Sequence, residues 1–584
     1  MTQRMGRRQK VSSREPLRFR YWTVVGLMGF FLLVMWARAG YLAVIDRDFL
    51  LHQGNERSIH LEEVQASRGI IRDRQGNPLA VSTPVTSLWI NPRQFGEDPD
   101  DIRELAKQLS VDPVDLQNKV HKARHREFMY VRRDLDPASA KLILAQGISG
   151  LYGQTEYMRY YPEGEPFAQV IGFTNIDGQG MDGIELEYND WLQGHNGLRK
   201  VMTDLHGHLI RDVDLIRPAV PGKDLYLSLD SRAQYLLYRE LAEQVQAQQA
   251  KSGAAVAINV QTGEVLAIAN VPSYNPNNRS HVSMEALRDR AVVDMLEPGS
   301  TMKPFTIAAG LTSGLFTPNS LFDTSPGTFR VGNHIIHDDD NNGVIDMTHI
   351  ITKSSNIGAS KIALALPPNA LPDMFKRFGF GHTTGSSFPG ESPGRLPAPS
   401  LWKPIGIAHM SFGYGETVTV LQLARAYAAL AAGGVLRPVS FVRQNQPVPG
   451  VRVISPVVDQ EIIRMLETVV SPEGTAQQAA VPGYWVAGKT GTVHKVVNGH
   501  YSPSQYRALF VGMAPATHPR YVLAVVIDTP SKSAYYGGLV SAPVFSRAMS
   551  EILRLEDVPP DHSSEHLAES VPQVRPMPRM GEKG

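Results

Sequence analysis

The sequence contains no cysteine among its 584 residues. Disulfide bonds, thiolate nucleophiles and cysteine-based zinc sites are therefore excluded, while the redox compartment is left open. An excess of charge of one sign is also lacking, because 58 Lys and Arg residues stand against 57 Asp and Glu residues. Without a net field that attracts a polyanion, the composition indicates no nucleic-acid partner.

One long hydrophobic run, YWTVVGLMGFFLLVMWARAGYLAVI, lies near the N-terminus and is uncharged over residues 22–36. A span of about 20 apolar residues crosses a bilayer. Because the preceding residues are strongly basic, we predict a cytoplasmic basic tail over 1–20, a transmembrane anchor over 21–45 and export of everything that follows. A cleaved signal peptide is the alternative, since Ala37-Arg38-Ala39 has the small-x-small form of a cleavage site. The apolar segment continues past that site, which favours the uncleaved anchor.

Composition also divides the rest of the chain. Residues 46–220 are charged and broken by many turns, and the segment IRPAVPGKD has the prolines and glycine of a linker. A second domain is predicted over 221–557. The tail, 558–584, is rich in Pro, Ser, Glu and Arg and is predicted to be disordered.

Strand patterns stand at both ends of this second domain. GAAVAINV and EVLAIANV read as a β-hairpin, and YWVAGKTGTVHKV, RALFVGMAP and RYVLAVVIDTP read as three strands of an antiparallel meander. Between them lie helical patterns, including TMKPFTIAAGLTSG, TVLQLARAYAALAAGG and DQEIIRMLETVV. The order predicts an α/β domain whose antiparallel sheet closes from distant segments and lies between helices.

Three short motifs occur in a fixed order within this domain. S-x-x-K, S-x-N and K-[S/T]-G each occur twice in the chain, and only one series is ordered as serine acyl enzymes require. That series is Ser300 and Lys303, then Ser354 and Asn356, then Lys489, Thr490 and Gly491. A G-x-S-x-G match at 390–394 is rejected as a nucleophile elbow, because Pro393 lacks the N–H that would form the oxyanion hole.

Ser300 and Lys303 are spaced to share one helix face, so the lysine amine can reach the serine hydroxyl. For Lys303 to act as a base it must be uncharged, and both burial and a second ammonium, for which Lys489 is the candidate, lower a lysine pKa. The alternative is a plain N-cap at Ser300 with a surface lysine. The ordered partner motifs favour the nucleophile and its base.

The other two motifs have matching roles. Ser354, at the start of a helix, can relay a proton to a leaving amine, and the Asn356 amide can hold a substrate carbonyl; alternatively, one of them is an ordinary helix cap. Lys489 lies on a strand where Gly491 leaves room for a peptide to pair alongside. We expect Lys489, Thr490 and Thr492 to bind the terminal carboxylate, and the N–H groups of Ser300 and Thr492 to form the oxyanion hole.

The acidic segment DDDNNGVIDMTH imitates the start of a calcium loop. However, the position of the final bidentate Glu is occupied by His349 and no flanking helix pair is evident, so a polar loop between strands is favoured and no metal site is predicted.

The motifs and many longer segments resemble class B penicillin-binding proteins, in particular the division-specific peptidoglycan D,D-transpeptidases of the penicillin-binding protein 3 type. The segments that carry the resemblance run from the anchor to about Leu555 and include RGIIRDRQGNPLAVSTPV, RYYPEGEPFAQVIGFTN, GIELEYNDWLQG, EPGSTMKPF, KSSNIGASKIAL, FGYG and YYGGLVSAPVF. The resemblance implies a non-catalytic, dimerisation-like pedestal over 46–220 and a penicillin-binding transpeptidase domain over 221–557.

The resemblance further implies a single-pass bacterial inner-membrane enzyme with its catalytic domain in the periplasm and without metal or cofactor. Ser300 would take the D-Ala-D-Ala end of a stem peptide as acyl donor, and an amine of a neighbouring stem would complete the cross-link of the septal wall. β-Lactams would acylate the same serine. Implied partners are a membrane glycosyltransferase and other division proteins. The alternatives are a β-lactamase, a D-Ala carboxypeptidase, or a non-catalytic division scaffold or β-lactam sensor.

Overall fold

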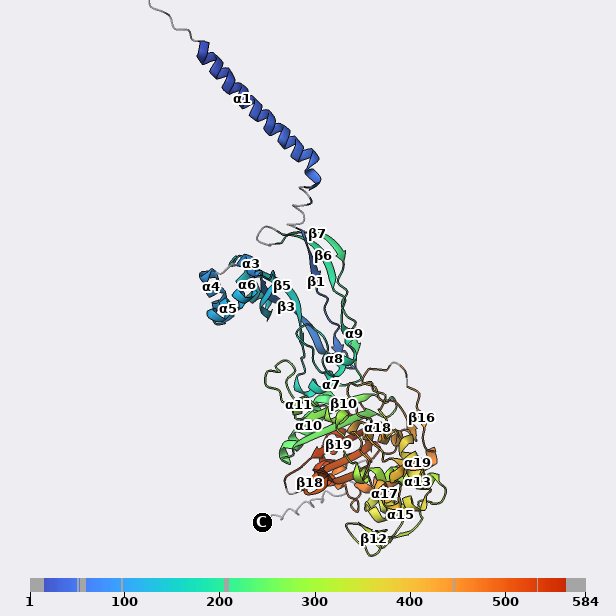
Figure 1. The fold of residues 1–584 in the computed structure, drawn as a ribbon. Coiled ribbons are helices and arrows are strands. Elements are labelled where there is room, and N and C mark those ends of the chain that lie inside the picture. The colour runs from blue at the N-terminus through green and yellow to red at the C-terminus, as the bar shows by residue number, and fades with distance from the viewer. Residues whose placement is uncertain are drawn as a thin grey trace, which may run out of the picture. The chain divides into compact units, whose positions relative to one another are not determined.

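The computed structural model describes residues 15–49, 52, 59–95, 98–203, 209–444, 446, 448–532 and 534–562 (Figure 1). The chain forms two compact units that are interleaved in sequence. Unit 1 comprises Met1–Ala66, Val85–Glu156 and His195–Val220, and unit 2 comprises Ser67–Pro84, Tyr157–Gly194 and Pro221–Gly584. The predicted basic tail lies outside the described residues up to position 14, as does the predicted disordered tail from position 563.

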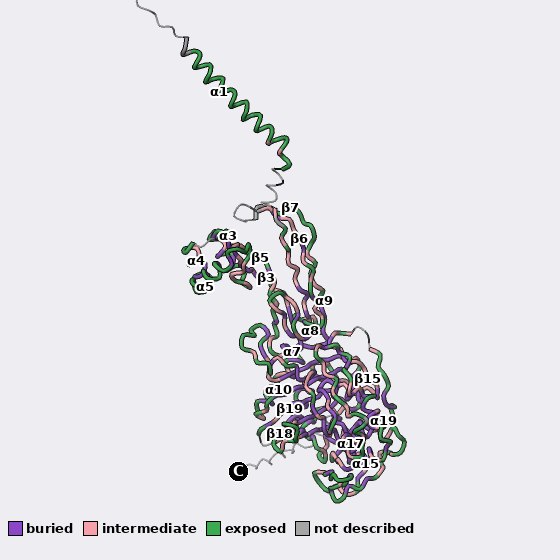
Figure 2. Tube along the Cα trace, viewed as in Figure 1, coloured by how far each residue is buried: buried purple, intermediate pink, exposed green. Residues whose placement is uncertain are grey.

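The apolar run forms helix α1 (Glu15–Gly40), which continues into the π-helical turn η1 (Tyr41–Ile45). The helical stretch Arg18–Ile45 contains an 18-residue window with a mean hydropathy of 1.8 and is long enough to cross a membrane. Its residues are exposed almost throughout, as the colouring by burial in Figure 2 shows. A long apolar helix whose residues stay exposed in the described part of the chain is the expected form of a membrane anchor.

Unit 1 also contains a three-stranded antiparallel sheet and a small helical layer. The sheet has the order β1 (Ile59–Val64), β6 (Gly197–Thr203), β7 (Leu209–Arg217). Asp-Pro pairs begin three helices, because the Asp side chain caps the first N–H groups and Pro is pre-set for the first turn. These helices are α4 (Pro99–Leu109), α5 (Pro113–Ala123) and α6 (Pro137–Leu144). They enclose a core with strands β3 (Pro78–Ile90) and β4 (Met129–Leu135), beside α3 (Pro92–Phe95) and β5 (Leu151–Tyr160).

Unit 2 is built on a five-stranded antiparallel sheet. Its order is β10 (Val265–Val271), β9 (Ser252–Asn259), β19 (Tyr521–Asp528), β18 (His500–Ala514), β17 (Ala487–Val497). The predicted hairpin and the predicted three-strand meander are therefore confirmed, and β9 pairs with β19 to join them. Among the described strands the order ends at β17, so the outer edge of β17 has no strand partner there and is called its free edge below.

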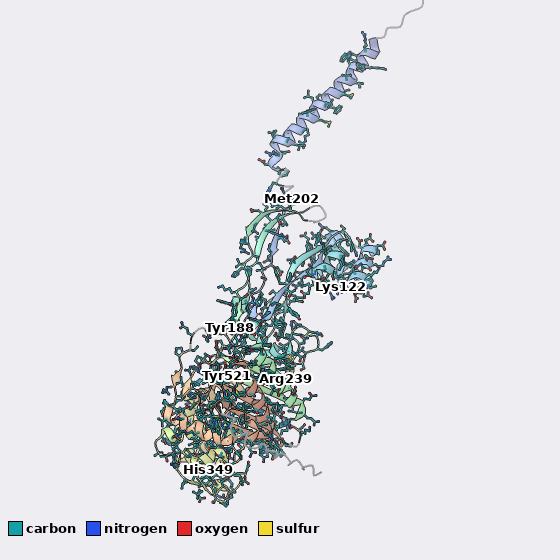
Figure 3. All side chains as sticks on the ribbon, turned by 180° about the vertical axis from the view of Figure 1, so that it is seen from behind. Lys122, Tyr188, Met202, Arg239, His349 and Tyr521 are labelled. Atoms are coloured by element: carbon teal, nitrogen blue, oxygen red, sulfur yellow. The ribbon has the colours of Figure 1, made fainter. Side chains whose placement is uncertain are left out.

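Both faces of this sheet are covered. Every residue of β9 is buried, and since alternate side chains point to opposite faces, helices must lie on each. Helices α10 (Ser231–Ala247) and α21 (Ala542–Leu555) pack on each other and on the sheet, and α18 (Val420–Ala431) packs on the sheet separately. Side chains fill this interior densely (Figure 3), and Tyr521 on β19 is 1% exposed. The predicted α/β class, with an antiparallel sheet between helices, is confirmed.

Shorter elements complete unit 2. The helices are η2 (Glu165–Phe167), α7 (Ala168–Ile171), α8 (Gly183–Glu187), α9 (Asn189–Leu192), α11 (Met284–Leu287), α12 (Arg290–Val293), η3 (Gly299–Met302), α13 (Lys303–Thr312), α14 (Met347–Thr352), α15 (Asn356–Ala365), α16 (Ala370–Arg377), η4 (Pro399–Leu401), α17 (Pro404–Met410), α19 (Pro456–Glu467), η5 (Thr468–Val470), η6 (Gln477–Ala479) and α20 (Gly537–Val540). The strands are β2 (Ile71–Arg72), β8 (Leu225–Tyr226), β11 (Phe322–Asp323), β12 (Thr328–Val331), β13 (His334–His337), β14 (Val344–Ile345), β15 (Val435–Leu436) and β16 (Val451–Arg452).

Candidate active site

Ser300 lies in the 3-10 turn η3, directly before helix α13. The Lys303 N–H donates to the Ser300 carbonyl, and Lys303 then begins α13. In a 3-10 turn, side chains three residues apart are eclipsed, which brings the amine of Lys303 over the hydroxyl of Ser300. Gly299 has φ +57°, and a Cβ there would lie 2.5 Å from Cγ2 of Val493. The turn therefore needs glycine before the serine.

The Lys303 amine is the centre of the site. Its Nζ donates to Ser300 Oγ at 2.8 Å, to Asn356 Oδ1 at 2.8 Å and to Ser354 Oγ at 3.0 Å, and it also contacts the Ser354 carbonyl. Lys303 is 0% exposed. All four acceptors are neutral oxygens, so these contacts hold the amine in place without the ionic partner that would keep it charged.

The second motif reaches Lys303 through a distorted turn. Ser354 has φ +58°, a left-handed conformation that costs a non-glycine residue roughly 1–3 kcal/mol and is concentrated at functional sites. The next residue, Ser355, caps helix α15 by accepting from the Gly358 N–H at 2.9 Å. The interpretation of Ser354 or Asn356 as the ordinary cap is therefore wrong. With Ser355 in that position, both side chains are free to face the amine.

Lys489 completes the cluster from the free-edge strand β17. Its Nζ lies 3.0 Å from Ser354 Oγ and 3.3 Å from Thr490 Oγ1, and its side chain is also 0% exposed. The Ser354 hydroxyl thus lies between two buried amines. Strand β17 approaches the nucleophile segment closely at Gly491, where a Cβ would lie 3.0 Å from the Pro298 carbonyl oxygen.

The electrostatics favour an uncharged base. Burial lowers the pKa of Lys303 to about 7, although the charges of Asp338 and Asp339 oppose this by raising it. Burial, and then the neighbouring Lys303, lower the pKa of Lys489 well below its ordinary value. The prediction that burial lowers the pKa of Lys303 agrees with the structure. The predicted lowering by a second ammonium at Lys489 is not among the causes of the Lys303 shift; instead, Lys303 lowers the pKa of Lys489.

A cavity of about 490 Å³ opens over these groups. Ligand sites for drug-sized molecules occupy ~300–1,000 Å³, so a peptide end fits. Five of the predicted residues line it, namely Ser300, Ser354, Asn356, Thr490 and Thr492. Aromatic rings line it as well, among which Tyr535 stacks on Tyr506 with ring centroids 4.2 Å apart.

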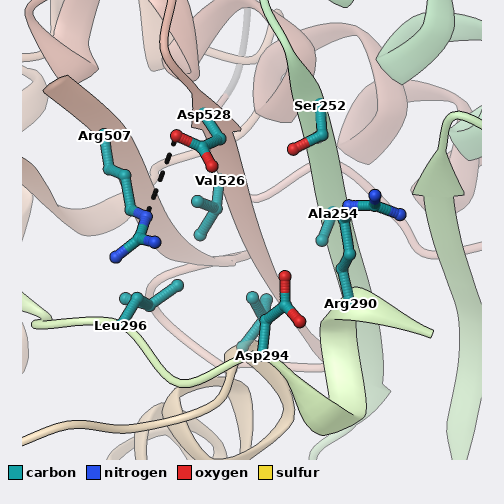
Figure 4. Close-up of a pocket in the computed structure, with 10 residues that line it drawn as sticks. Ser252, Ala254, Arg290, Asp294, Leu296, Arg507, Val526 and Asp528 are labelled. Carbon is teal, nitrogen blue, oxygen red and sulfur yellow. Dashed lines mark ion pairs between the residues drawn. The ribbon is translucent and has the colours of Figure 1, made fainter. Parts of the chain in front are cut away.

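A second cavity, lined by Arg290, Asp294, Arg507 and Asp528 among others, has a volume of only about 20 Å³ (Figure 4). Arg507 and Asp528 face each other there at 3.9 Å. This volume suits about one water molecule and excludes a peptide. The candidate site is therefore the larger cavity.

All eight predicted site residues lie on four neighbouring segments. These segments are η3 with α13, the turn before α15, α15 itself and β17, which carry Ser300, Lys303, Ser354, Asn356, Lys489, Thr490, Gly491 and Thr492. The two threonine hydroxyls are engaged, because Thr490 Oγ1 contacts Thr475 Oγ1 at 2.9 Å and Thr492 Oγ1 accepts from the Gly537 N–H at 3.1 Å. Substrate contacts at these hydroxyls remain predictions.

Sequence reasoning missed several supports of the site. Gly413 lies against the nucleophile turn, where its carbonyl accepts from the Gly299 N–H at 3.0 Å, and the buried Tyr427 hydroxyl donates to the Thr301 carbonyl at 2.8 Å. Asp338, in the segment that imitates a calcium loop, caps the N-terminus of α15. Among the described residues, no three His, Cys, Asp or Glu side chains form a group that suits a metal ion. The available signal in the sequence was the FGYG segment, which contains Gly413.

Comparison with known proteins agrees with this geometry. A family model described as the penicillin-binding protein transpeptidase domain matches residues 253–550, and one for the penicillin-binding protein dimerisation domain matches residues 63–227. The chain is 42% identical over 550 residues to the probable peptidoglycan D,D-transpeptidase PbpC of Pseudomonas aeruginosa, covering 94% of this chain and 97% of that protein. It is 41% identical over 556 residues to the peptidoglycan D,D-transpeptidase FtsI of Escherichia coli K12, covering 94% of each.

A solved structure is similar as well. The apo transpeptidase domain of penicillin-binding protein 3 from Burkholderia pseudomallei is 44% identical, with a TM-score of 0.54, over 58% of this chain and 98% of that one. The resemblance inferred from the motifs is thus confirmed. An ordered set of three motifs that folds into one cluster, and relatives matched over nearly their whole length, lead to the same conclusion: this chain belongs to the penicillin-binding protein transpeptidase family.

Proposed function

We propose that this chain is a membrane-anchored peptidoglycan D,D-transpeptidase that cross-links stem peptides of the septal cell wall and is a target of β-lactams. The names of its relatives and the transpeptidase family model support this activity. One observation carries the proposal at the level of chemistry. The hydroxyl of Ser300 lies 2.8 Å from the amine of a fully buried lysine whose pKa is lowered to about 7.

In the first step, uncharged Lys303 takes the proton of Ser300 as the oxygen attacks the carbonyl of the penultimate D-Ala. The N–H groups of Ser300 and Thr492 are the proposed donors to the oxyanion. As the C–N bond breaks, the leaving D-Ala amine needs a proton. The Ser354 hydroxyl, 3.0 Å from the amines of both Lys303 and Lys489, is the proposed relay.

In the second step, an acceptor amine attacks the ester carbonyl. The bond from Ser300 oxygen to the carbonyl carbon breaks, an amide forms, and the proton released by the amine returns to the serine through the same lysine. The stem peptide would pair with the free edge of β17 by strand addition, which orients the donor without side-chain specificity. Lys489 and the hydroxyls of Thr490 and Thr492 would donate hydrogen bonds to the terminal carboxylate.

A β-lactam would enter the same reaction at its first step. Ser300 opens the strained ring amide, but the leaving nitrogen stays tethered to the acyl group. An acceptor amine is then blocked, and the adduct persists.

The anchor supports the proposed location. The basic residues before the apolar run favour a cytoplasmic N-terminus and a periplasmic catalytic domain; Arg18 and Arg20 lie in α1, and the others lie outside the described residues. In this proposal residues 46–220 serve as the non-catalytic pedestal and 221–557 as the transpeptidase domain. A membrane glycosyltransferase and other division proteins are the proposed partners of the anchor and pedestal.

The test uses the full-length chain in detergent with a stem peptide ending in D-Ala-D-Ala and a labelled D-amino acid as acceptor amine. We expect release of D-Ala together with incorporation of the label. Release without incorporation would indicate a carboxypeptidase instead. Mass spectrometry would measure the lifetime of the penicillin adduct. Hydrolysis of the adduct within seconds would indicate a β-lactamase.

A matched pair of variants makes the test specific. Ser300→Ala removes the proposed nucleophile, whereas Ser400→Ala removes the exposed serine of the second S-x-x-K sequence, three residues before Lys403. Only the first variant should lose product. If Ser300→Ala kept full activity, or still supported cross-linking in cells that lack other copies, a scaffold or sensor role would replace the proposed enzyme.

A further inference from the structure

Asp338 follows strand β13 and reaches the helix that carries the second motif. Its Oδ1 accepts from the N–H groups of Asn356 at 2.6 Å and Ile357 at 3.0 Å, and its Oδ2 accepts from the Ser355 hydroxyl at 2.5 Å. Helix α15 is ten residues long, and its first N–H groups have no partner within the helix. One carboxylate therefore satisfies two of them and also holds the capping serine.

The neighbouring residue of the same segment holds the Asn356 side chain. The amide nitrogen of Asn356 donates to the His337 carbonyl at 3.0 Å, which leaves its amide oxygen directed at Lys303, 2.8 Å away. Rotation of this amide would place an N–H against the amine. The end of β13 and Asp338 together thus fix both the backbone and the side chain of Asn356.

Asp338 also brings a negative charge close to the buried base. The groups that face Lys303 are Ser300 from η3, Ser354 and Asn356 from the start of α15, Lys489 from β17, and the carboxylates of Asp338 and Asp339 from the loop. Of these charges, Asp338 has the largest effect on Lys303, and it favours the protonated amine. The Asp338 carboxylate therefore opposes the effect of burial, which lowers the pKa of Lys303.

We propose that Asp338 is a positioning residue of the acylation step, which holds the Ser354–Asn356 turn against Lys303 and whose negative charge raises the pH at which acylation begins to fail. The inference rests on the proposed function, because it assigns Lys303 as the base of Ser300. The proposal assigns two effects to Asp338: its hydrogen bonds position the start of α15, and its charge acts on Lys303. Two substitutions separate these effects.

Asp338→Asn keeps an oxygen that can accept from the helix N–H groups but removes the charge. Without the carboxylate, the Lys303 ammonium is less stable, so the acid limb of the acylation rate should move to lower pH by about 0.5–1 unit. The rate on the plateau above that limb should stay within about threefold of the wild-type rate, since Asn is as good a helix cap as Asp.

Asp338→Ala removes both the charge and the cap. The acid limb should move as in Asp338→Asn. The plateau rate should fall about fivefold or more, the factor that corresponds to the ~1 kcal/mol of helix stability an N-cap acceptor typically contributes. Asp340→Asn is the matched control, because this exposed carboxylate lies in the same loop and makes none of these contacts. It should change neither quantity.

The experiment measures the second-order rate of acylation by a fluorescent penicillin from pH 5.5 to 9 for the full-length chain and the three variants, with thermal unfolding of each as a check. The proposal is overturned if Asp338→Asn leaves the acid limb unmoved, if Asp340→Asn moves it equally, or if Asp338→Ala keeps the wild-type plateau. These outcomes concern Asp338 alone as long as the wild-type adduct is on Ser300. A wild-type chain without that adduct would instead refute the proposed function.

Discussion

Acidification should slow the reaction of Ser300 by an amount that follows from the state of one amine. An ordinary lysine, with a pKa near 10.4, is uncharged in only about one molecule in three thousand at pH 7. Burial lowers the pKa of Lys303 to about 7, so about half the molecules hold the free base at that pH. The structure thus provides about a thousandfold more active base than solvent exposure would allow.

The acylation rate should fall as the pH falls, because the amine acts as a proton acceptor and must be uncharged. Above pH 8 the base is almost wholly uncharged and the rate should be level, whereas at pH 6 about one-tenth is uncharged and the rate should be about tenfold lower. The full-length chain would be acylated by a fluorescent penicillin across this range at constant ionic strength. Circular dichroism at each pH separates loss of base from loss of fold.

A rate that stays constant from pH 5.5 to 8.5 in a folded chain would refute this reasoning, because it would mean that the amine is uncharged throughout or takes no part. A rate that rises toward acid would exclude Lys303 as the base altogether.

Two further predictions concern the support of the site. Gly413→Ala places a Cβ 2.0 Å from the Gly299 carbonyl oxygen at a φ of +90°, so acylation should fall at least tenfold with a lower unfolding temperature; unchanged acylation would show that the turn yields without cost. Glu416→Gln should stabilise the chain by about 1–3 kcal/mol at pH 8 but not at pH 4, because burial raises the pKa of Glu416 well above its ordinary value while the unfolded chain ionises from about pH 4. Urea unfolding at both pH values measures this, and equal differences at the two would contradict it.

Much of the site was predictable from local spacing and order. Ser300 and Lys303 are three residues apart, so any helical turn brings them together, and the turn type changes only how closely. The strands of unit 2 are recognisable in the sequence as apolar runs between turns, and the meander needs only short connections. The interleaving of the two units could not be predicted from the sequence, because residues 67–84 and 157–194 join unit 2 through contacts that no local pattern encodes.

The start of helix α15 shows where sequence reasoning ends. Ser354, Ser355 and Asn356 are consecutive, and each residue type makes a good cap. Which of them caps depends on the left-handed φ of Ser354 and on Asp338, seventeen residues before Ser355 in sequence. The sequence predicts that the acidic segment is a polar loop that only imitates a calcium loop. The contact of Asp338 with α15 was not predictable, because nothing in the spacing of Asp338 specifies a helix N-terminus so far along the chain.

The most direct measurement of the whole account is the position of the covalent bond. The full-length chain is labelled with a fluorescent penicillin, digested and analysed by mass spectrometry, with Ser400→Ala as the control that should label fully. The account predicts a single penicilloyl adduct on Ser300, which disappears in Ser300→Ala. An adduct on any other residue, or a labelled Ser300→Ala chain, would contradict it.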